Sequence, residues 1–156
     1  MSSSASARAS LGVELLGVVA RLNRLATQRT TLPLPWAQAR LLGTIEDQGP
    51  TRISDLAALD HCSQPTMTTQ VRRLEDAGLV TRTTDPADAR AVLIQITAAG
   101  IETLRRVRAD RAGVIDPHIA SLGDDDRQTL AAAVRVLQRL LNDAAPKSMV
   151  FTPPNR

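Results

Sequence analysis

Apolar residues recur at helical spacing near both ends of the chain. At the N-terminal end the intervals alternate between four and three residues, at Leu11, Leu15, Val18, Leu22 and Leu25. This spacing predicts an amphipathic helix that begins at an N-cap, Ser10, and ends before Pro33. A matching stripe near the other end predicts a last helix opening on three aspartates, with apolar positions at Leu130, Val134, Leu137 and Leu141. Such narrow stripes suit packing between two subunits; the alternative is a core helix of one chain.

The middle of the chain predicts a helix-turn-helix. Pro33 and Pro35 interrupt any continuous helix there. Beyond them the pattern predicts a helix over 36–48, a small strand over 51–53, a helix over 55–60 capped by Ser54, a turn over 61–63 and a second helix over 64–77. Two short helices joined by a turn of about three to four residues are the helix-turn-helix pattern.

A two-stranded ribbon is expected next. Gly78 stands where helices commonly end, and 80–84 and 91–96 read as strands. Asp85-Pro86 opens their connecting turn, which Arg82 and Arg90 flank. A helix followed by such a ribbon is the layout of a winged helix. The helix then enters a major groove of DNA, and the ribbon tip lies beside the backbone or the minor groove.

A long helix is expected after the ribbon, from a cap at Thr97 to about residue 122, with Gly113 and Pro117 bending or breaking it. Four of its residues form a basic band: Arg105, Arg106, Arg108 and Arg111. Glu102 and Asp110 lie close to them in sequence. An ion-paired, solvated band is therefore favoured over one that contacts DNA.

The second helix of the helix-turn-helix has two distinct faces. Met67, Val71 and Leu74 recur at core spacing. The opposite face and its flanks hold Pro65, Thr66, Thr68, Thr69, Arg72 and Arg73. Hydroxyl and guanidinium groups suit contacts with base edges and phosphates. The alternative is a solvated face, which more often shows Glu/Lys pairs than threonines.

Composition narrows the function further. The net charge is +3, with Lys147 the sole lysine, and Trp36 and Phe151 are the only aromatic residues. Single-stranded nucleic acid, which is bound by stacking on aromatic side chains, is therefore disfavoured. A single cysteine and the lack of an apolar run of ~20 residues indicate a cytoplasmic protein without a membrane span. Any ligand pocket is expected to be lined mainly by aliphatic residues and Trp36, with arginine as a further candidate.

The residue inventory argues against an enzyme. Two histidines, one cysteine and no Gly-rich phosphate loop leave little from which to build a catalytic site, and no zinc-ligand spacing occurs. We therefore expect no metal and no cofactor. Cys62 precedes the second helix, where a thiol pKa can be lowered. Oxidation of Cys62 is accordingly an alternative regulatory mechanism, beside a structural role in the core of the turn.

Residues 54–100 resemble the MarR family of bacterial winged-helix transcriptional regulators. The matching segments are Leu56-Ala57, SQPTMT at 63–68, RLE at 73–75, AGLV at 77–80, DPADAR at 85–90 and IQITAAG at 94–100. The resemblance implies a homodimer on a pseudo-palindromic operator in double-stranded DNA, commonly a repressor released by a small-molecule effector. It also implies that Arg90 reaches DNA, while Asp88 braces the wing or an arginine of the recognition helix. DNA contacts are expected from Ser63, Gln64, Pro65, Thr66, Thr68, Thr69, Arg72, Arg73, Arg82, Asp88 and Arg90.

The predicted fold is thus mainly α with a small β-wing. A winged helix-turn-helix at 33–97 is flanked by dimerisation helices at 10–32 and 98–145, a disordered start at 1–9 and a tail at 146–156. Four residues depart from the family pattern: Thr69 and Arg72 in the recognition helix, His61 at the usual glycine of the turn, and Cys62 at an aliphatic position. His61 is therefore expected to adopt a positive φ. The operator, the sign of regulation and the effector stay open.

Overall fold

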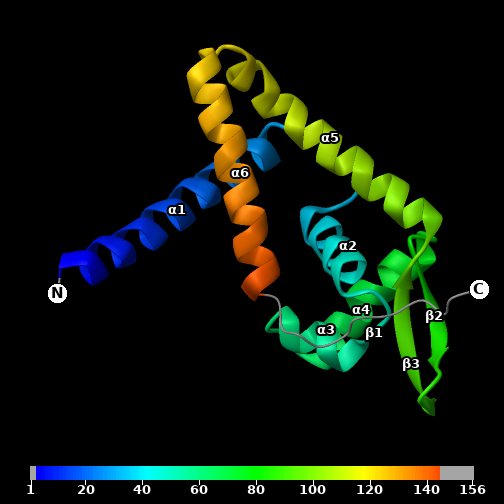
Figure 1. Ribbon diagram of the computed structural model, residues 1–156. Helices are drawn as coiled ribbons and strands as arrows, with labels where there is room; N and C mark the ends of the chain where they lie inside the picture. The colour runs from blue at the N-terminus through cyan, green and yellow to red at the C-terminus, as the bar shows by residue number, and fades with distance from the viewer. Residues whose placement is uncertain (1–2, 145–156) are drawn as a thin grey trace, which may run out of the picture. The chain divides into compact units, whose positions relative to one another are not determined.

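The computed structural model describes residues 3–144, with nine elements (Figure 1). In chain order these are α1 Ser3–Gln28, α2 Trp36–Gln48, β1 Thr51–Arg52, α3 Ile53–Leu59, α4 Gln64–Asp76, β2 Val80–Asp85, β3 Asp88–Ile96, α5 Ala98–Ala120 and α6 Asp124–Ala144. The sheet is antiparallel with the order β1-β3-β2. This mainly helical fold with a small β-wing is the fold class that the sequence predicted. The tail predicted over 146–156 lies outside the described residues.

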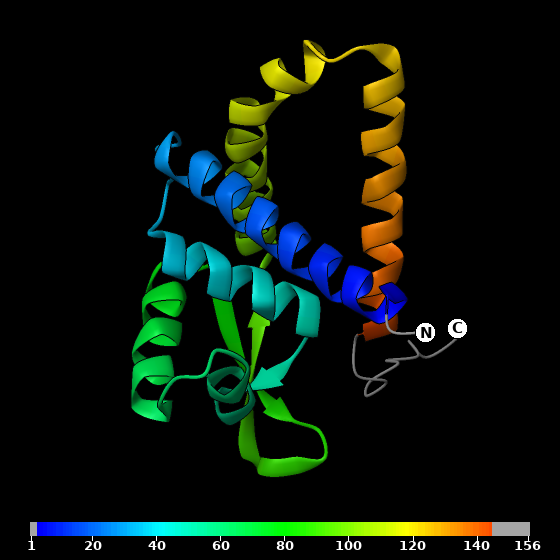
Figure 2. The same ribbon diagram turned by 90° about the vertical axis from the view of Figure 1, so that its left-hand side faces the viewer.

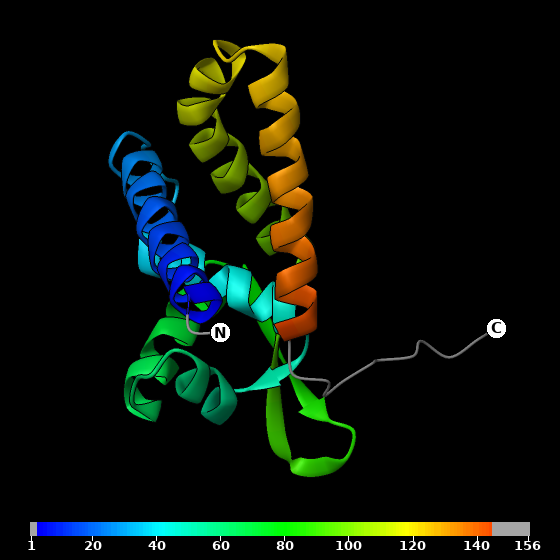
Figure 3. The ribbon, with the colours of Figure 1, turned by 60° about the vertical axis from the view of Figure 1, so that its left-hand side comes forward.

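Contacts divide the chain into two compact units, residues 1–115 and 116–156. The first unit contains the helix-turn-helix and the wing. In Figures 2 and 3 the β2–β3 hairpin projects beyond α3 and α4, which lie to one side of it. The second unit contains the end of α5 and the whole of α6.

The core of the first unit is assembled from one face of each element. Its largest fully buried side chains are Leu42, Ile45, Leu56, Met67, Val71, Leu74 and Ile94. The three residues of α4 assigned to the core from their spacing are all among them. Ion pairs fasten the periphery: Arg40 of α2 pairs with Asp60 at the end of α3. Glu46 of α2 pairs with Arg108 of α5 at 2.7 Å.

Local signals set both ends of α4. The Ser63 side chain accepts from the Thr66 N–H as N-cap, and Pro65 lies in the first turn, where its missing N–H is not needed. At the other end Gly78 has φ 71°, and the N–H of Leu79 donates to the Leu74 carbonyl at 2.9 Å. This is the Schellman arrangement. The direction in which β2 leaves α4 is therefore encoded locally.

The start of α5 is joined to the end of α4. The Thr97 hydroxyl accepts from the Gly100 N–H at 3.0 Å, which confirms its predicted role as a cap, and it donates to the Gly78 carbonyl at 2.7 Å. Gly100 lies so close to Leu79 that an added Cβ would be 2.2 Å from the Leu79 carbonyl oxygen. Only glycine fits there.

Two predictions of helix starts are wrong. Residues 3–9 are helical, and Ser10 lies inside α1, where its hydroxyl donates to Glu14 instead of capping the helix. Ser54 does not cap α3, because α3 begins at Ile53, one residue before Ser54. The helix α5 ends at Ala120, close to the predicted end, and Gly113 and Pro117 do not break it. A proline removes one N–H and crowds one carbonyl, and α5 extends only three residues beyond it.

Candidate DNA-binding surface

The exposed face of α4 holds the residues predicted to meet DNA. All eleven predicted contact residues are exposed: Ser63, Gln64, Pro65, Thr66, Thr68, Thr69, Arg72 and Arg73 around α4, and Arg82, Asp88 and Arg90 in the hairpin. Within the described part of the chain, the guanidinium groups of Arg72, Arg73 and Arg90 form no ion pair. These three side chains are therefore available to phosphates or base edges.

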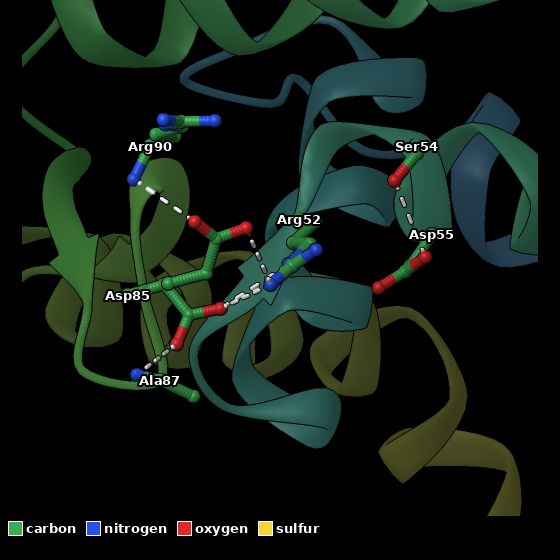
Figure 4. A network of polar contacts seen from close by, with 7 residues as sticks. Arg52, Ser54, Asp55, Asp85, Ala87 and Arg90 are labelled. Atoms are coloured by element: carbon green, nitrogen blue, oxygen red, sulfur yellow. Dashed lines mark hydrogen bonds and ion pairs between the residues drawn. The ribbon is translucent and has the colours of Figure 1, made fainter.

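An ion-pair network fixes the tip of the hairpin (Figure 4). Arg52 of β1 donates to Oδ2 of Asp85 from Nε at 3.2 Å and from Nη2 at 2.6 Å. The other oxygen of Asp85 accepts from the Ala87 N–H at 2.9 Å. Asp85 is only 12% exposed, so these bonds are partly shielded from water. The strand before the helix-turn-helix is thereby joined to the tip of the wing.

The charges of this network reinforce one another. Hydrogen bonds from Arg52, and then from the Ala87 N–H, hold the pKa of Asp85 below its ordinary value. The hydrogen bond to Asp85 in turn raises the pKa of Arg52. Both groups are therefore charged at neutral pH. The network was not foreseen from the sequence, because nothing local links residues separated by 33 positions.

Asp88 braces the wing rather than the recognition helix. Its Oδ1 accepts from the Arg90 N–H at 3.1 Å, and its Oδ2 lies 3.8 Å from Nη2 of Arg52. Of the two roles implied by the family resemblance, this geometry matches the bracing of the wing. Because Asp88 holds the backbone of Arg90 in place, the Arg90 side chain leaves a fixed point of β3.

The sequence placed Arg82 beside the ribbon tip, and this position is wrong. Arg82 pairs in register with Ile94, in the middle of the hairpin. Its Nε donates to the carboxylate of Glu75 at 2.9 and 3.1 Å. The strands are longer than predicted and the turn is shorter, because Asp85 and Asp88 already face each other in the ladder. Arg82 thus links β2 to the end of α4.

The turn between α3 and α4 contains two of the four residues that depart from the family pattern. His61 has φ 50°, as expected at a position where glycine is usual. Cys62 is half-buried against the core, and its N–H donates to the Ala57 carbonyl at 3.0 Å. Cys62 therefore packs against the core as predicted, although it is only partly buried. This packing favours the structural role over the redox alternative.

Three of the four arginines in the basic band of α5 have partners within the described part of the protein. Arg105 pairs with Glu102 and Arg108 with Glu46. Arg111 lies 4.2 Å from the centre of the Trp36 ring and donates to the Asn23 side chain at 2.9 Å. Burial lowers the pKa of Arg111. The predicted ion-paired band is confirmed for Arg105 and Arg108.

A pocket opens beside Trp36, with a volume of about 260 Å³. Its lining consists of Asn23, Arg24, Thr27, Gln28 and Trp36. Trp36 and an arginine, Arg24, line this pocket as expected, whereas the expected aliphatic residues do not, because the other lining residues come from a polar segment of α1. Across residues 3–144, no three metal-ligating side chains cluster. None of the described helices has the length and apolar character needed to cross a bilayer.

The chain thus has a winged helix-turn-helix with an exposed Thr/Arg helix face, and comparison with known proteins shows which family this segment resembles. Residues 34–92 match the model of the MarR family. The segment from α2 to the wing is therefore similar to the MarR family. Members of this family are transcriptional regulators that bind DNA through their helix-turn-helix, so α3 and α4 form the DNA-binding motif and β2–β3 forms its wing.

Relatives and solved structures similar to this chain are also transcriptional regulators. The chain is 28% identical, over 87% of its length and 96% of the relative, to the HTH-type transcriptional regulator MT0903.1 of Mycobacterium tuberculosis. The transcriptional regulator Tm0710 of Thermotoga maritima superposes with a TM-score of 0.68 and 27% identity, over 86% of this chain and 95% of that one. A transcriptional regulator of Pseudomonas aeruginosa superposes with a TM-score of 0.71 and 26% identity, over 91% of this chain and 97% of that one. These relatives are regulators rather than enzymes.

Proposed function

We propose that the chain is a MarR-family repressor that binds a pseudo-palindromic site in double-stranded DNA as a homodimer, in the cytoplasm. The observation that supports this most directly is the surface formed by α4 and the wing. Arg72 and Arg73 form no ion pair among the described residues of the helix face, and Arg90 projects from a hairpin whose tip is fixed by Arg52. An exposed helix face beside a braced cationic wing suits simultaneous contact with a major groove and the flanking backbone.

Exposed apolar side chains support the homodimer. In α1, Leu11, Val13 and Leu16 are 67%, 73% and 71% exposed, and in α6, Leu140 and Leu141 are 55% and 66% exposed. Clusters of exposed apolar residues commonly mark sites of protein association. We propose that the partner of each cluster is a second copy of the chain. Two-fold symmetry would then place two copies of α4 on two half-sites about one helical turn apart.

The dimer is tested by a charge placed on the apolar stripe of α6. Leu141→Arg should produce monomers in sedimentation equilibrium and should abolish specific DNA binding. Ala132 is exposed and lies about half a turn around the same helix, so Ala132→Arg should leave both properties unchanged. A wild-type monomer at the concentration that saturates DNA would exclude the homodimer.

The DNA target is tested by selecting bound fragments from genomic DNA and footprinting the winners. Two protected half-sites related by two-fold symmetry, centred about 10 bp apart, are expected. Transcription in vitro from a promoter overlapping the site should fall as protein is added. A rise in transcription would make the protein an activator, and a footprint without two-fold symmetry would contradict the dimer.

We further propose that a small-molecule effector releases the protein from DNA. The pocket beside Trp36 supports this, because its size suits a small ligand, and an indole ring with polar groups around it can orient one. Trp36 is the only tryptophan in the chain, so its fluorescence reports on the pocket directly. An effector should change this fluorescence and release operator DNA over the same concentration range. Release without any fluorescence change would place the effector elsewhere.

A further inference from the structure

Two threonines on the exposed face of α4 use their hydroxyl protons inside the helix. The Thr68 hydroxyl donates to the carbonyl of Gln64 at 2.8 Å, and the Thr69 hydroxyl donates to the carbonyl of Pro65 at 3.0 Å. Both side chains are exposed. A hydroxyl has one proton and two lone pairs. Each threonine therefore presents its oxygen to the surface as a hydrogen-bond acceptor.

This arrangement limits what the two threonines can bind. A phosphate oxygen only accepts hydrogen bonds, as do N7 and O6 of guanine and O4 of thymine. Neither hydroxyl can donate to these groups without giving up its bond within α4. The donors that a major groove presents are the amino groups on N6 of adenine and N4 of cytosine.

The neighbouring polar residues differ in this respect. The hydroxyls of Ser63 and Thr66 lie 2.8 Å apart and share one hydrogen bond, so one of their two protons stays unused. Arg72 and Arg73 can only donate, and each follows a threonine by four residues and so lies beside it on the same face. The face therefore consists of two parallel rows, Thr68–Arg72 and Thr69–Arg73, each with an acceptor followed by a donor.

We propose, building on the DNA-binding function proposed above, that Thr68 and Thr69 determine base specificity as acceptors. Oγ1 of each accepts a hydrogen bond from the amino group of an adenine or a cytosine in the major groove. The arginine of the same row donates to an acceptor, which is a guanine edge or a phosphate. Thr69 lies nearest the middle of the face, opposite the core residues Met67 and Val71. Thr69 therefore prefers a base with an amino group more strongly than Thr68 does.

The test removes the amino group from the DNA and the acceptor from the protein. Each adenine of the selected operator is replaced in turn by purine, and each cytosine by 2-pyrimidinone, bases that lack the amino group. Wild-type protein should lose about three- to tenfold in affinity at one position per half-site for each threonine, as for one hydrogen bond. Thr69→Val removes the acceptor at nearly constant shape. In the Thr69→Val variant, removal of the amino group from the DNA should no longer lower the affinity at one of these positions. The loss of affinity at the other positions should be the same as in wild type.

Thr69→Ser is the matched control, because serine retains the hydroxyl and should behave as wild type at that position. Thr68→Val repeats the experiment for the other row, and circular dichroism establishes that each variant folds. Equal losses for wild type and Thr69→Val at every position would overturn the proposal. So would a Thr69→Val variant that binds all sequences uniformly more weakly, which would indicate a phosphate contact. A wild-type protein that prefers no sequence at all would refute the proposed function together with this inference.

Discussion

Nη2 of Arg52 lies 2.6 Å from Oδ2 of Asp85, although the two residues are 33 positions apart in the chain. One belongs to the strand that precedes the helix-turn-helix, and the other ends the first strand of the wing. Arg52 also lies within ion-pair distance of Asp88. A single guanidinium thus lies against two carboxylates of the wing and offsets part of their negative charge.

Removal of that guanidinium should weaken DNA binding. Arg52→Met leaves Asp85 and Asp88 uncompensated, so we expect lower affinity for operator and non-operator DNA alike in fluorescence anisotropy. Arg52→Lys should retain more affinity, since a cation remains. The double variant Arg52→Met/Asp85→Asn should recover part of the loss, because the unpaired carboxylate is gone. Strictly additive effects of the two substitutions would show that the pairing itself is unimportant.

The same pair should give stability a pH dependence. The pKa of Asp85 is lowered in the folded protein, relative to an ordinary value of 3.8. Its stabilising contribution is therefore complete above about pH 3.8 and is lost as the pH falls through the lower folded-state pKa. Urea unfolding should show wild type more stable than Asp85→Asn at neutral pH. The difference in the free energy of unfolding should shrink only below about pH 3.8. A difference that grows on acidification would contradict the lowered pKa.

Arg90 should contribute a phosphate contact with little sequence preference. Arg90→Ala is expected to weaken binding to all DNA sequences about equally and to reduce the salt dependence of binding by about 0.9 in the log–log slope. Arg29→Ala, an exposed arginine at the end of α1, makes the same change in net charge away from the wing. If both variants bind like wild type, the wing does not touch DNA in the way proposed.

Loss of the ion pair between Glu75 and Arg82 should strengthen DNA binding, whereas loss of Arg90 should weaken it. Glu75→Gln removes a negative charge from the last turn of α4 and releases the Arg82 guanidinium, whose side chain is 38% exposed. Non-specific DNA binding should therefore become tighter and more dependent on salt. Stability should change by less than ~1 kcal/mol, as for other exposed ion pairs. A reduced affinity would instead indicate that the link to Glu75 aligns α4 for binding.

Two glycines of α5 should respond oppositely to the same substitution. Gly100→Ala places a methyl group 2.2 Å from the Leu79 carbonyl oxygen, so we expect a loss of more than ~2 kcal/mol in thermal or urea unfolding. Gly113 has no neighbour within 4 Å of an added Cβ. Gly113→Ala should therefore stabilise the helix by about 0.5–1 kcal/mol. Similar behaviour of the two variants would contradict the close contact at Gly100.

The sequence predicted best where the determinants are local. Periodicity identified Met67, Val71 and Leu74 as core residues, and the chemistry of helix ends identified Gly78 and Thr97. Spacing along one helix also separated the exposed face of α4 from its buried face. These features depend on residues within one or two turns of one another, so a single sequence contains them.

Long-range pairing explains what the sequence did not predict. The partners of Arg52 and Arg82 are brought close only when the hairpin folds back on β1 and α4, so no local pattern reveals them. Ser54 was assigned as a cap from its residue type, but the pairing of Thr51 and Arg52 with β3 fixes where β1 ends and α3 begins. In each case a tertiary contact decided between local alternatives.

The junction at Gly78, Thr97 and Gly100 has a mechanical consequence. It holds the end of α4 in direct contact with the start of α5. The Leu79 carbonyl oxygen fills the space beside Gly100, and two hydrogen bonds of Thr97 hold the same segment. A displacement of α5 therefore either moves the end of α4 or breaks the contacts of Thr97 and Gly100. Packed interfaces switch between arrangements rather than deform smoothly. Strain applied to α5 far from the DNA would thus reach the major groove as a change in the tilt of α4.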